Sequence, residues 1–138
     1  MNKIRKEILI DGNNFDTLDE FYNEINKLLT KDLTWKTGHN FNAFNDLLRG
    51  GFGIHEYGEP LLIKWVNYKK SKSDLGYNAT IQYYKNMLNN CHQSSIEHFK
   101  KELKNAELHK GKTLLDIIIE IILETNNSGH DCKLETME

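Results

Sequence analysis

Short apolar runs, separated by long stretches with helical periodicity, constrain the fold of this chain most strongly. Glu7 to Asp11 and Leu61 to Val66 are each predicted to form a buried strand, and Cys132 to Glu135 a short closing strand. Helical patterns fill the intervals, and strands that are joined by helical crossovers lie parallel. The sequence therefore predicts an α/β fold, with a small three-stranded parallel sheet packed with helices.

Residue pairs that resemble capping boxes mark the starts of three helices. In this arrangement a hydroxyl side chain and an acidic side chain three residues later satisfy each other's backbone N–H groups. The pairs are Thr17 with Glu20, Ser94 with Glu97, and Thr113 with Asp116. Further helices are predicted over 40–49, 67–75 and 78–89. The isoleucine-rich run 114–123 fits a helix or a strand, and its length and its cap favour the helix.

Size and charge limit the possible classes of protein. The 138 residues, 38% of them hydrophobic and 28% charged, suit one globular domain over 1–138. A net charge of −2 argues against a strongly basic nucleic-acid binder and leaves room for a basic protein partner. No signal peptide or membrane span is recognisable, so we expect a cytoplasmic protein that is a monomer when free, with Cys91 and Cys132 as reduced thiols.

No set of side chains in the sequence indicates catalysis or metal binding. The six histidines lack metal-ligand spacing, and we interpret each as a surface residue. No nucleophile elbow, phosphate-binding loop or dinucleotide fingerprint is present. We therefore expect no enzyme activity, no metal and no cofactor.

The stretch from Lys36 to Gly51 is predicted to be a loop that leads into a short amphipathic helix. Asn40 is a plausible N-cap, and Gly50 suits the left-handed conformation that ends a helix. Helical spacing directs one set of side chains toward a core, with Ala43 and Leu47 on its flanks, and directs another set outward. The inward set is Phe41, Phe44 and Leu48, and the outward set is Asn42, Asn45, Asp46 and Arg49. One carboxylate and two amides on an apolar base suit recognition of a partner better than chemistry.

Two other patterns leave two interpretations open. One pattern is an acidic row, with Asp116, Glu120 and Glu124 at four-residue spacing. These carboxylates form either a solvated helix face or an acidic stripe that meets a basic partner. The segment from Arg49 to Gly53 is either a helix end followed by a loop, which we favour, or a single copy of an arginine–glycine RNA-binding box.

The outward-facing helix and its leading loop resemble a known family. The positions Gly38, Asn40, Ala43, Asp46, Leu48 and Gly50 match, in spacing and type, the recognition loop and second helix of the barstar family, the intracellular inhibitors of the ribonuclease barnase. The strand that ends at Gly12, the helix from Thr17 to Leu29, and the segment from Pro60 to Lys72 fit the same family in the same order.

The resemblance implies a three-stranded parallel sheet with packed helices, and inhibition by insertion of the second helix into the active site of a nuclease. Asp46 would then occupy the place of a substrate phosphate and face arginine and histidine side chains of the enzyme. The predicted partner-binding residues are Lys36, Gly38, Asn40, Asn42, Asn45, Asp46, Gly50 and, as a distal acidic contact, Glu120.

Several positions depart from the family pattern. Asn42 replaces a second contact aspartate, Asn45 replaces a tryptophan, and Lys36 with Thr37 replaces an aromatic pair. A longer loop is expected over Gly51 to Tyr57, and a helical insertion at about 77–110. These differences change the expected partner more than the fold.

The favoured interpretation is a barstar-like inhibitor or immunity protein that occludes the active site of a basic ribonuclease or related nuclease toxin, with no direct contact to nucleic acid. The alternative is a non-inhibitory adaptor domain of the same fold that binds another protein or an RNA.

Overall fold

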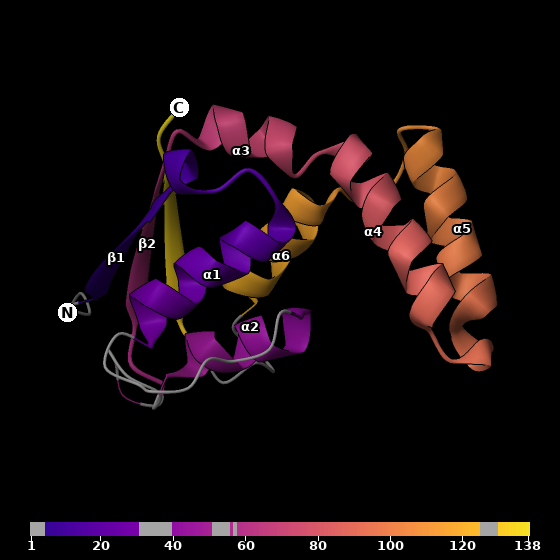
Figure 1. Ribbon diagram of the computed structural model, residues 1–138. Helices are drawn as coiled ribbons and strands as arrows, with labels where there is room; N and C mark the ends of the chain where they lie inside the picture. The colour runs from indigo at the N-terminus through magenta and orange to yellow at the C-terminus, as the bar shows by residue number, and fades with distance from the viewer. Residues whose placement is uncertain (1–4, 31–39, 51–55, 57, 125–129) are drawn as a thin grey trace.

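The computed structural model describes residues 5–30, 40–50, 56, 58–124 and 130–138 (Figure 1). In these residues two α-helices lie between the first and second strands and four between the second and third, in the predicted order. Their bounds are β1 Lys6–Asp11, α1 Leu18–Leu29, α2 Phe41–Arg49, β2 Leu61–Val66, α3 Tyr68–Asp74, α4 Tyr77–Asn90, α5 Ile96–Glu107, α6 Leu114–Leu123 and β3 Cys132–Thr136, with short 3₁₀ turns η1 Gly12–Asn14 and η2 Gln93–Ser95.

The three strands form one parallel sheet in the order β1-β2-β3, with β2 in the centre. Ile8 of β1 lies beside Ile63 of β2, and Ile63 lies beside Leu134 of β3. This confirms the predicted small α/β fold with its three-stranded parallel sheet. The run 114–123 is a helix, and Thr113 and Asp116 form the predicted capping box.

Helices cover the sheet unevenly, and this corrects one expectation. Figure 1 shows α1, α2 and α6 on the same side of the sheet. In β1 only Ile8 and Ile10 are buried, whereas Glu7 and Leu9 are exposed. β1 is therefore a half-buried edge strand and not the fully buried strand that its apolar run suggested, because none of the helices in the described residues covers its second face.

An aromatic cluster around Trp65 joins the sheet to α1 and α3. The Trp65 ring stacks on Phe21 of α1 with centroids 5.6 Å apart, and its Nε1 donates a hydrogen bond to Ser71 Oγ at 2.9 Å. Gly12 permits this packing, because a Cβ there would lie 2.6 Å from the carbonyl oxygen of Asn67 and 2.8 Å from Ser71 Oγ.

Helices α4 and α5 pack against each other and project from one side of the molecule as an arm, here called the α4–α5 hairpin (Figure 1). Its first helix is joined to α6 through Thr80, whose Oγ1 accepts a hydrogen bond from the Leu114 backbone N–H at 2.9 Å. The predicted Ser94–Glu97 capping box is wrong. The chain first makes the turn η2, and α5 begins at Ile96 after Ser95.

Candidate functional site

Helix α2 lies at the end of the molecule opposite α3 and packs against α1 and α6 (Figure 1). Asn40 caps its first turn as predicted, since its Oδ1 accepts a hydrogen bond from the Ala43 N–H at 2.7 Å. Phe44, Leu47 and Leu48 are buried, so the helix has a firm apolar base. The helix ends at Gly50, where φ is 90°, a backbone conformation that favours glycine.

The opposite face of α2 is polar and accessible to solvent. Asn42 is exposed, and Asn45, Asp46 and Arg49 are partly exposed. The structure therefore places these four side chains outward, as the helical spacing predicted. Phe41, the first residue of the helix, is only partly buried and contacts two tyrosine rings, Tyr22 of α1 and Tyr83 of α4. That contact with the α4–α5 hairpin was not predicted.

The carboxylate at the centre of this face is paired within its own helix. Arg49 Nη1 lies 2.9 Å from Asp46 Oδ1, and the side chains of Asp46 and Arg49 remain 50% and 34% exposed. An exposed pair of this kind is worth only a few tenths of a kcal/mol. The Asp46 carboxylate can therefore exchange this partner for a cation on another molecule at little cost.

The other residues proposed from the sequence are in different surroundings. Lys36 and Gly38 lie outside the described residues, as does most of the loop predicted over Gly51 to Tyr57. Glu120 is exposed on α6 and pairs with Lys112 at 2.8 Å. Lys112, the cationic partner of Glu120, precedes α6, whereas Arg49, the partner of Asp46, lies within the same helix as Asp46. Asp116 in the same acidic row caps the helix, accepting a hydrogen bond from the Thr113 N–H at 2.9 Å.

A buried histidine lies near α2, where the sequence had predicted only surface histidines. His130 is 3% exposed, and its Nε2 donates a hydrogen bond to the Ile121 carbonyl at 2.8 Å, close to the end of α6. Burial lowers the pKa of His130. The hydrogen bonds to the Ile121 and Ile122 carbonyls oppose this shift, the positive charge of Arg49 adds to it, and the Glu124 carboxylate opposes it weakly. Sequence spacing gave no sign of this burial, because the residues around His130 in space come from α2 and α6.

Metal-ligand side chains and thiols are further candidates for a chemical site. Within them, no three His, Cys, Asp or Glu side chains are grouped so that they could hold a metal ion. Burial raises the pKa of the Cys132 thiol to about 12, so this free cysteine stays protonated and packs as an apolar residue. No helix in the described part of the chain is long and apolar enough to cross a membrane.

Comparison with known families gives a match over residues 5–104 to the family described as Barstar (barnase inhibitor). The matched range contains α2 and all of its outward-facing side chains and ends within α5, so Glu120 lies beyond it. Comparison with curated proteins and with solved structures gives no match. The match covers most of the chain, and the observed parallel sheet agrees with the fold expected from the resemblance. The chain belongs to the barstar family.

Proposed function

We propose that this protein binds a basic ribonuclease or a related nuclease toxin and blocks its active site with α2 and the residues that lead into it. The protein acts by occupying the site and performs no chemistry of its own. The observation that carries the proposal is the half-exposed Asp46 carboxylate, held on a helix whose other face is buried.

The physical argument starts from the substrate of the partner. A ribonuclease must bind the anionic phosphates of RNA, and it does so with cationic side chains. A carboxylate on a rigid helix offers those cations an anion that is not cleaved, and an arginine binds it with charge-assisted, sometimes bidentate, hydrogen bonds. The buried base formed by Phe44, Leu47 and Leu48 fixes the helix, so little freedom is lost on binding.

Around Asp46 we assign a ring of weaker contacts. Asn42 and Asn45 offer amide groups on the same helix face, and Asn40 presents the start of the helix. Lys36 and Gly38 of the leading loop, Gly50 at the helix end and Glu120 as a distal acidic contact complete the proposed surface. Because Asn42 and Asn45 are neutral, Asp46 carries the negative charge at the centre of this face of α2, and the two amides add hydrogen bonds around it.

Capture with two forms of the protein tests the proposal. Immobilised wild-type protein and its Asp46→Ala variant are exposed to extract from the native cells, and proteins retained only by the wild type are identified. We expect a small basic nuclease whose RNA cleavage is abolished by one equivalent of the wild-type protein. Since the inhibitor is proposed to protect the RNA of its own cell, we expect it in the cytoplasm.

Other results of the same experiment would contradict the proposal. Retention of a nuclease that remains fully active would contradict occlusion of the active site. Equal inhibition by the wild type and by Asp46→Ala would remove Asp46 from the mechanism. Retention of a protein or RNA without nuclease activity would favour an adaptor on the same fold. Turnover of RNA by the purified protein alone would indicate an enzyme.

A further inference from the structure

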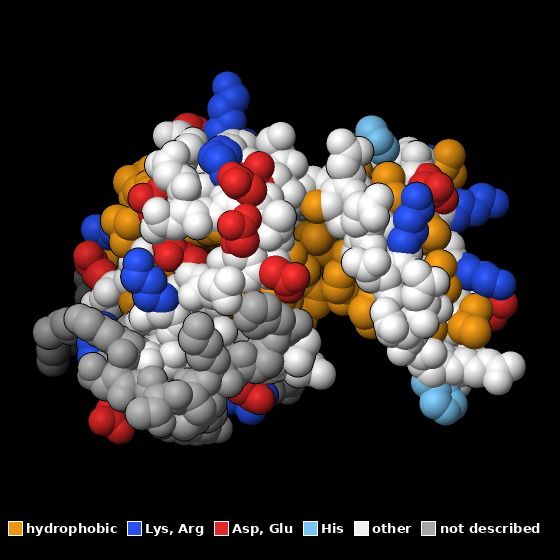
Figure 2. All heavy atoms as spheres, viewed as in Figure 1, with side chains coloured by type: hydrophobic (Ala, Val, Ile, Leu, Met, Phe, Trp, Pro, Cys, Tyr) orange, Lys and Arg blue, Asp and Glu red, His pale blue; other side chains and the backbone are white. Residues whose placement is uncertain are grey.

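A groove of about 330 Å³ opens between the start of α1 and the first helix of the α4–α5 hairpin. Leu18, Ala79, Tyr83 and Leu114 form its apolar lining. Figure 2 shows this region as a hollow with hydrophobic surface at its bottom, between the body of the molecule and the hairpin. We call it the α1–α4 groove.

One wall of the groove is acidic. Asp16, Asp19 and Asp74 line it from the body side, and the described lining residues include no lysine, arginine or histidine. Figure 2 shows acidic side chains along the body side of the hollow. The opposite wall, on α4, carries the neutral side chains of Gln82 and Asn86. The groove therefore combines apolar surface with negative charge on a single side.

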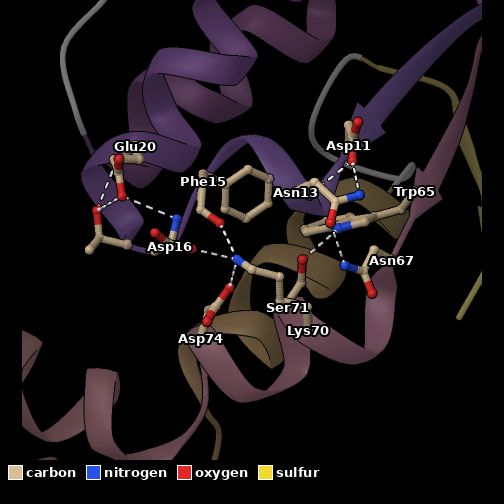
Figure 3. Close-up of polar contacts among 11 residues, drawn as sticks. Asp11, Asn13, Phe15, Asp16, Glu20, Trp65, Asn67, Lys70, Ser71 and Asp74 are labelled. Atoms are coloured by element: carbon tan, nitrogen blue, oxygen red, sulfur yellow. Dashed lines mark hydrogen bonds and ion pairs between the residues drawn. The ribbon is translucent and has the colours of Figure 1, made fainter.

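A lysine behind the acidic wall holds two of its carboxylates in place. Lys70 Nζ lies 2.6 Å from Asp16 Oδ1 and 2.6 Å from Asp74 Oδ2, and it also donates a hydrogen bond to the Phe15 carbonyl at 2.7 Å (Figure 3). One ammonium group contacts two carboxylates, those of Asp16 and Asp74, so this cluster of three side chains keeps a net negative charge. The side chain of Asp16 remains 73% exposed, so the residual negative charge is accessible to a partner.

The groove adjoins the first residue of α2. Tyr83, part of its lining, contacts the ring of Phe41, with centroids 5.7 Å apart. Phe41 immediately precedes Asn42, and the axial rise from Phe41 to Asp46 is about 8 Å. A protein interface of ordinary size covers about 800 Å² on each partner, a patch roughly 30 Å across. One bound protein is therefore large enough to cover both the groove and the exposed face of α2.

We propose that the α1–α4 groove is a second docking site for the nuclease partner and takes a segment in which lysine or arginine side chains accompany apolar ones. This inference rests on the proposed function for the identity of the partner, whereas the chemistry of the segment follows from the groove. Apolar side chains of the segment fill the hollow, and its cations face Asp16, Asp19 and Asp74. The α4–α5 hairpin thus selects which basic nuclease is bound.

Substitutions at Gln82 test the charge requirement without touching the acidic wall. Gln82 and Asn78 are both exposed on α4, but only Gln82 lines the groove, so Asn78 is the matched control. The probe is a synthetic peptide of alternating arginine and leucine, titrated into isotope-labelled protein. We expect chemical-shift changes at Leu18, Gln82 and Leu114. Gln82→Arg should weaken peptide binding about fivefold, and Gln82→Glu should tighten it up to about fivefold. Asn78→Arg and Asn78→Glu should leave the affinity unchanged.

Three results would contradict the assignment of the groove as a cation-selective site. These are chemical-shift changes confined to another surface, equal binding of a glutamate–leucine peptide, and equal effects of substitutions at positions 78 and 82. The captured nuclease provides the second measurement. Weaker binding of the nuclease to Gln82→Arg, with Asn78→Arg unaffected, supports the inference. Sensitivity to Asp46→Ala without sensitivity to Gln82→Arg overturns the inference and leaves the proposed function standing. Failure to capture any nuclease overturns the proposed function, and with it the assignment of the groove to a nuclease.

Discussion

Arg49 and Asp46 are paired one turn apart on the exposed face of α2, with Nη1 and Oδ1 separated by 2.9 Å. The pair keeps the carboxylate at the surface of a helix whose opposite side is fixed in the core. Because exposed pairs contribute little to stability, an arginine from a partner can take the place of Arg49. The free protein thus already holds its main anion in the position that the proposed complex requires.

Replacement of Asp46 should separate binding from folding. We expect Asp46→Ala to weaken the complex with the cognate nuclease by at least about 2 kcal/mol, the hot-spot scale that the barnase–barstar complex itself helped to define. The free energy of unfolding should change by no more than about 0.5 kcal/mol, because the lost pair is exposed. Titration calorimetry and urea denaturation measure the two quantities, and a large loss of stability would mean that Asp46 is mainly structural.

The hydrogen bond from Trp65 to Ser71 should be important for folding. Ser71 is fully buried, so Ser71→Ala leaves the indole N–H without its acceptor and should lower the free energy of unfolding by about 1–3 kcal/mol. Ser73→Ala, an exposed change in the same helix, is the control and should alter stability by less than about 0.5 kcal/mol. Equal effects of the two substitutions in denaturant titrations would contradict this role.

Thr80 should determine how firmly the α4–α5 hairpin is attached to the body. Its hydroxyl donates to the Gly76 carbonyl at 2.8 Å and accepts from the Leu114 N–H at 2.9 Å. Thr80→Val keeps the shape and removes both bonds, so we expect a loss of about 1–3 kcal/mol in unfolding free energy and faster amide exchange at Leu114. Thr80→Ser retains the hydroxyl and should preserve protection at Leu114; loss of protection in both variants would refute the assignment.

Burial of His130 predicts a loss of stability in mild acid. Its pKa is lowered in the folded protein, so the unfolded chain binds more protons between that value and the ordinary value near 6.5. The contribution is fully present above pH 6.5 and is lost as the pH falls toward the folded pKa. Denaturant midpoints measured from pH 7.5 to 5 should fall more steeply for the wild type than for His130→Gln. The exposed His98→Gln should follow the wild type, and identical profiles for all three proteins would contradict the prediction.

Sequence signals predicted the secondary structure well where a cap and the apolar spacing of the same helix agreed. The Asn40 cap and the spacing of Phe44 and Leu48 defined α2 and its outward face, since both signals depend on residues within a single helix. The Ser94–Glu97 pair was a false signal. There His92 Nδ1 accepts a hydrogen bond from the Ser94 N–H at 3.2 Å, and a 3₁₀ turn precedes the helix.

Buried polar groups were beyond the reach of sequence patterns. Glu24 is 6% exposed in the middle of α1, where its Oε2 accepts hydrogen bonds from the Asp11 N–H at 3.3 Å and Asn14 Nδ2 at 3.0 Å. A glutamate in an amphipathic helix ordinarily indicates the solvated side. Its burial depends on where the end of β1 and the turn η1 come to lie, and no helical period encodes that position.

The sequence by itself determined the order of helices and strands, the parallel sheet that this order requires, and the buried and exposed faces of α2. Those features follow from periodicity, caps and chain connectivity, which act over a few residues or through the order of elements. Only the tertiary structure decided that β1 has one open face, that His130 is buried, and that Phe41 of α2 meets Tyr83 of α4 beside an acidic groove. Such contacts join residues far apart in the chain, and they depend on how complete helices pack against one another.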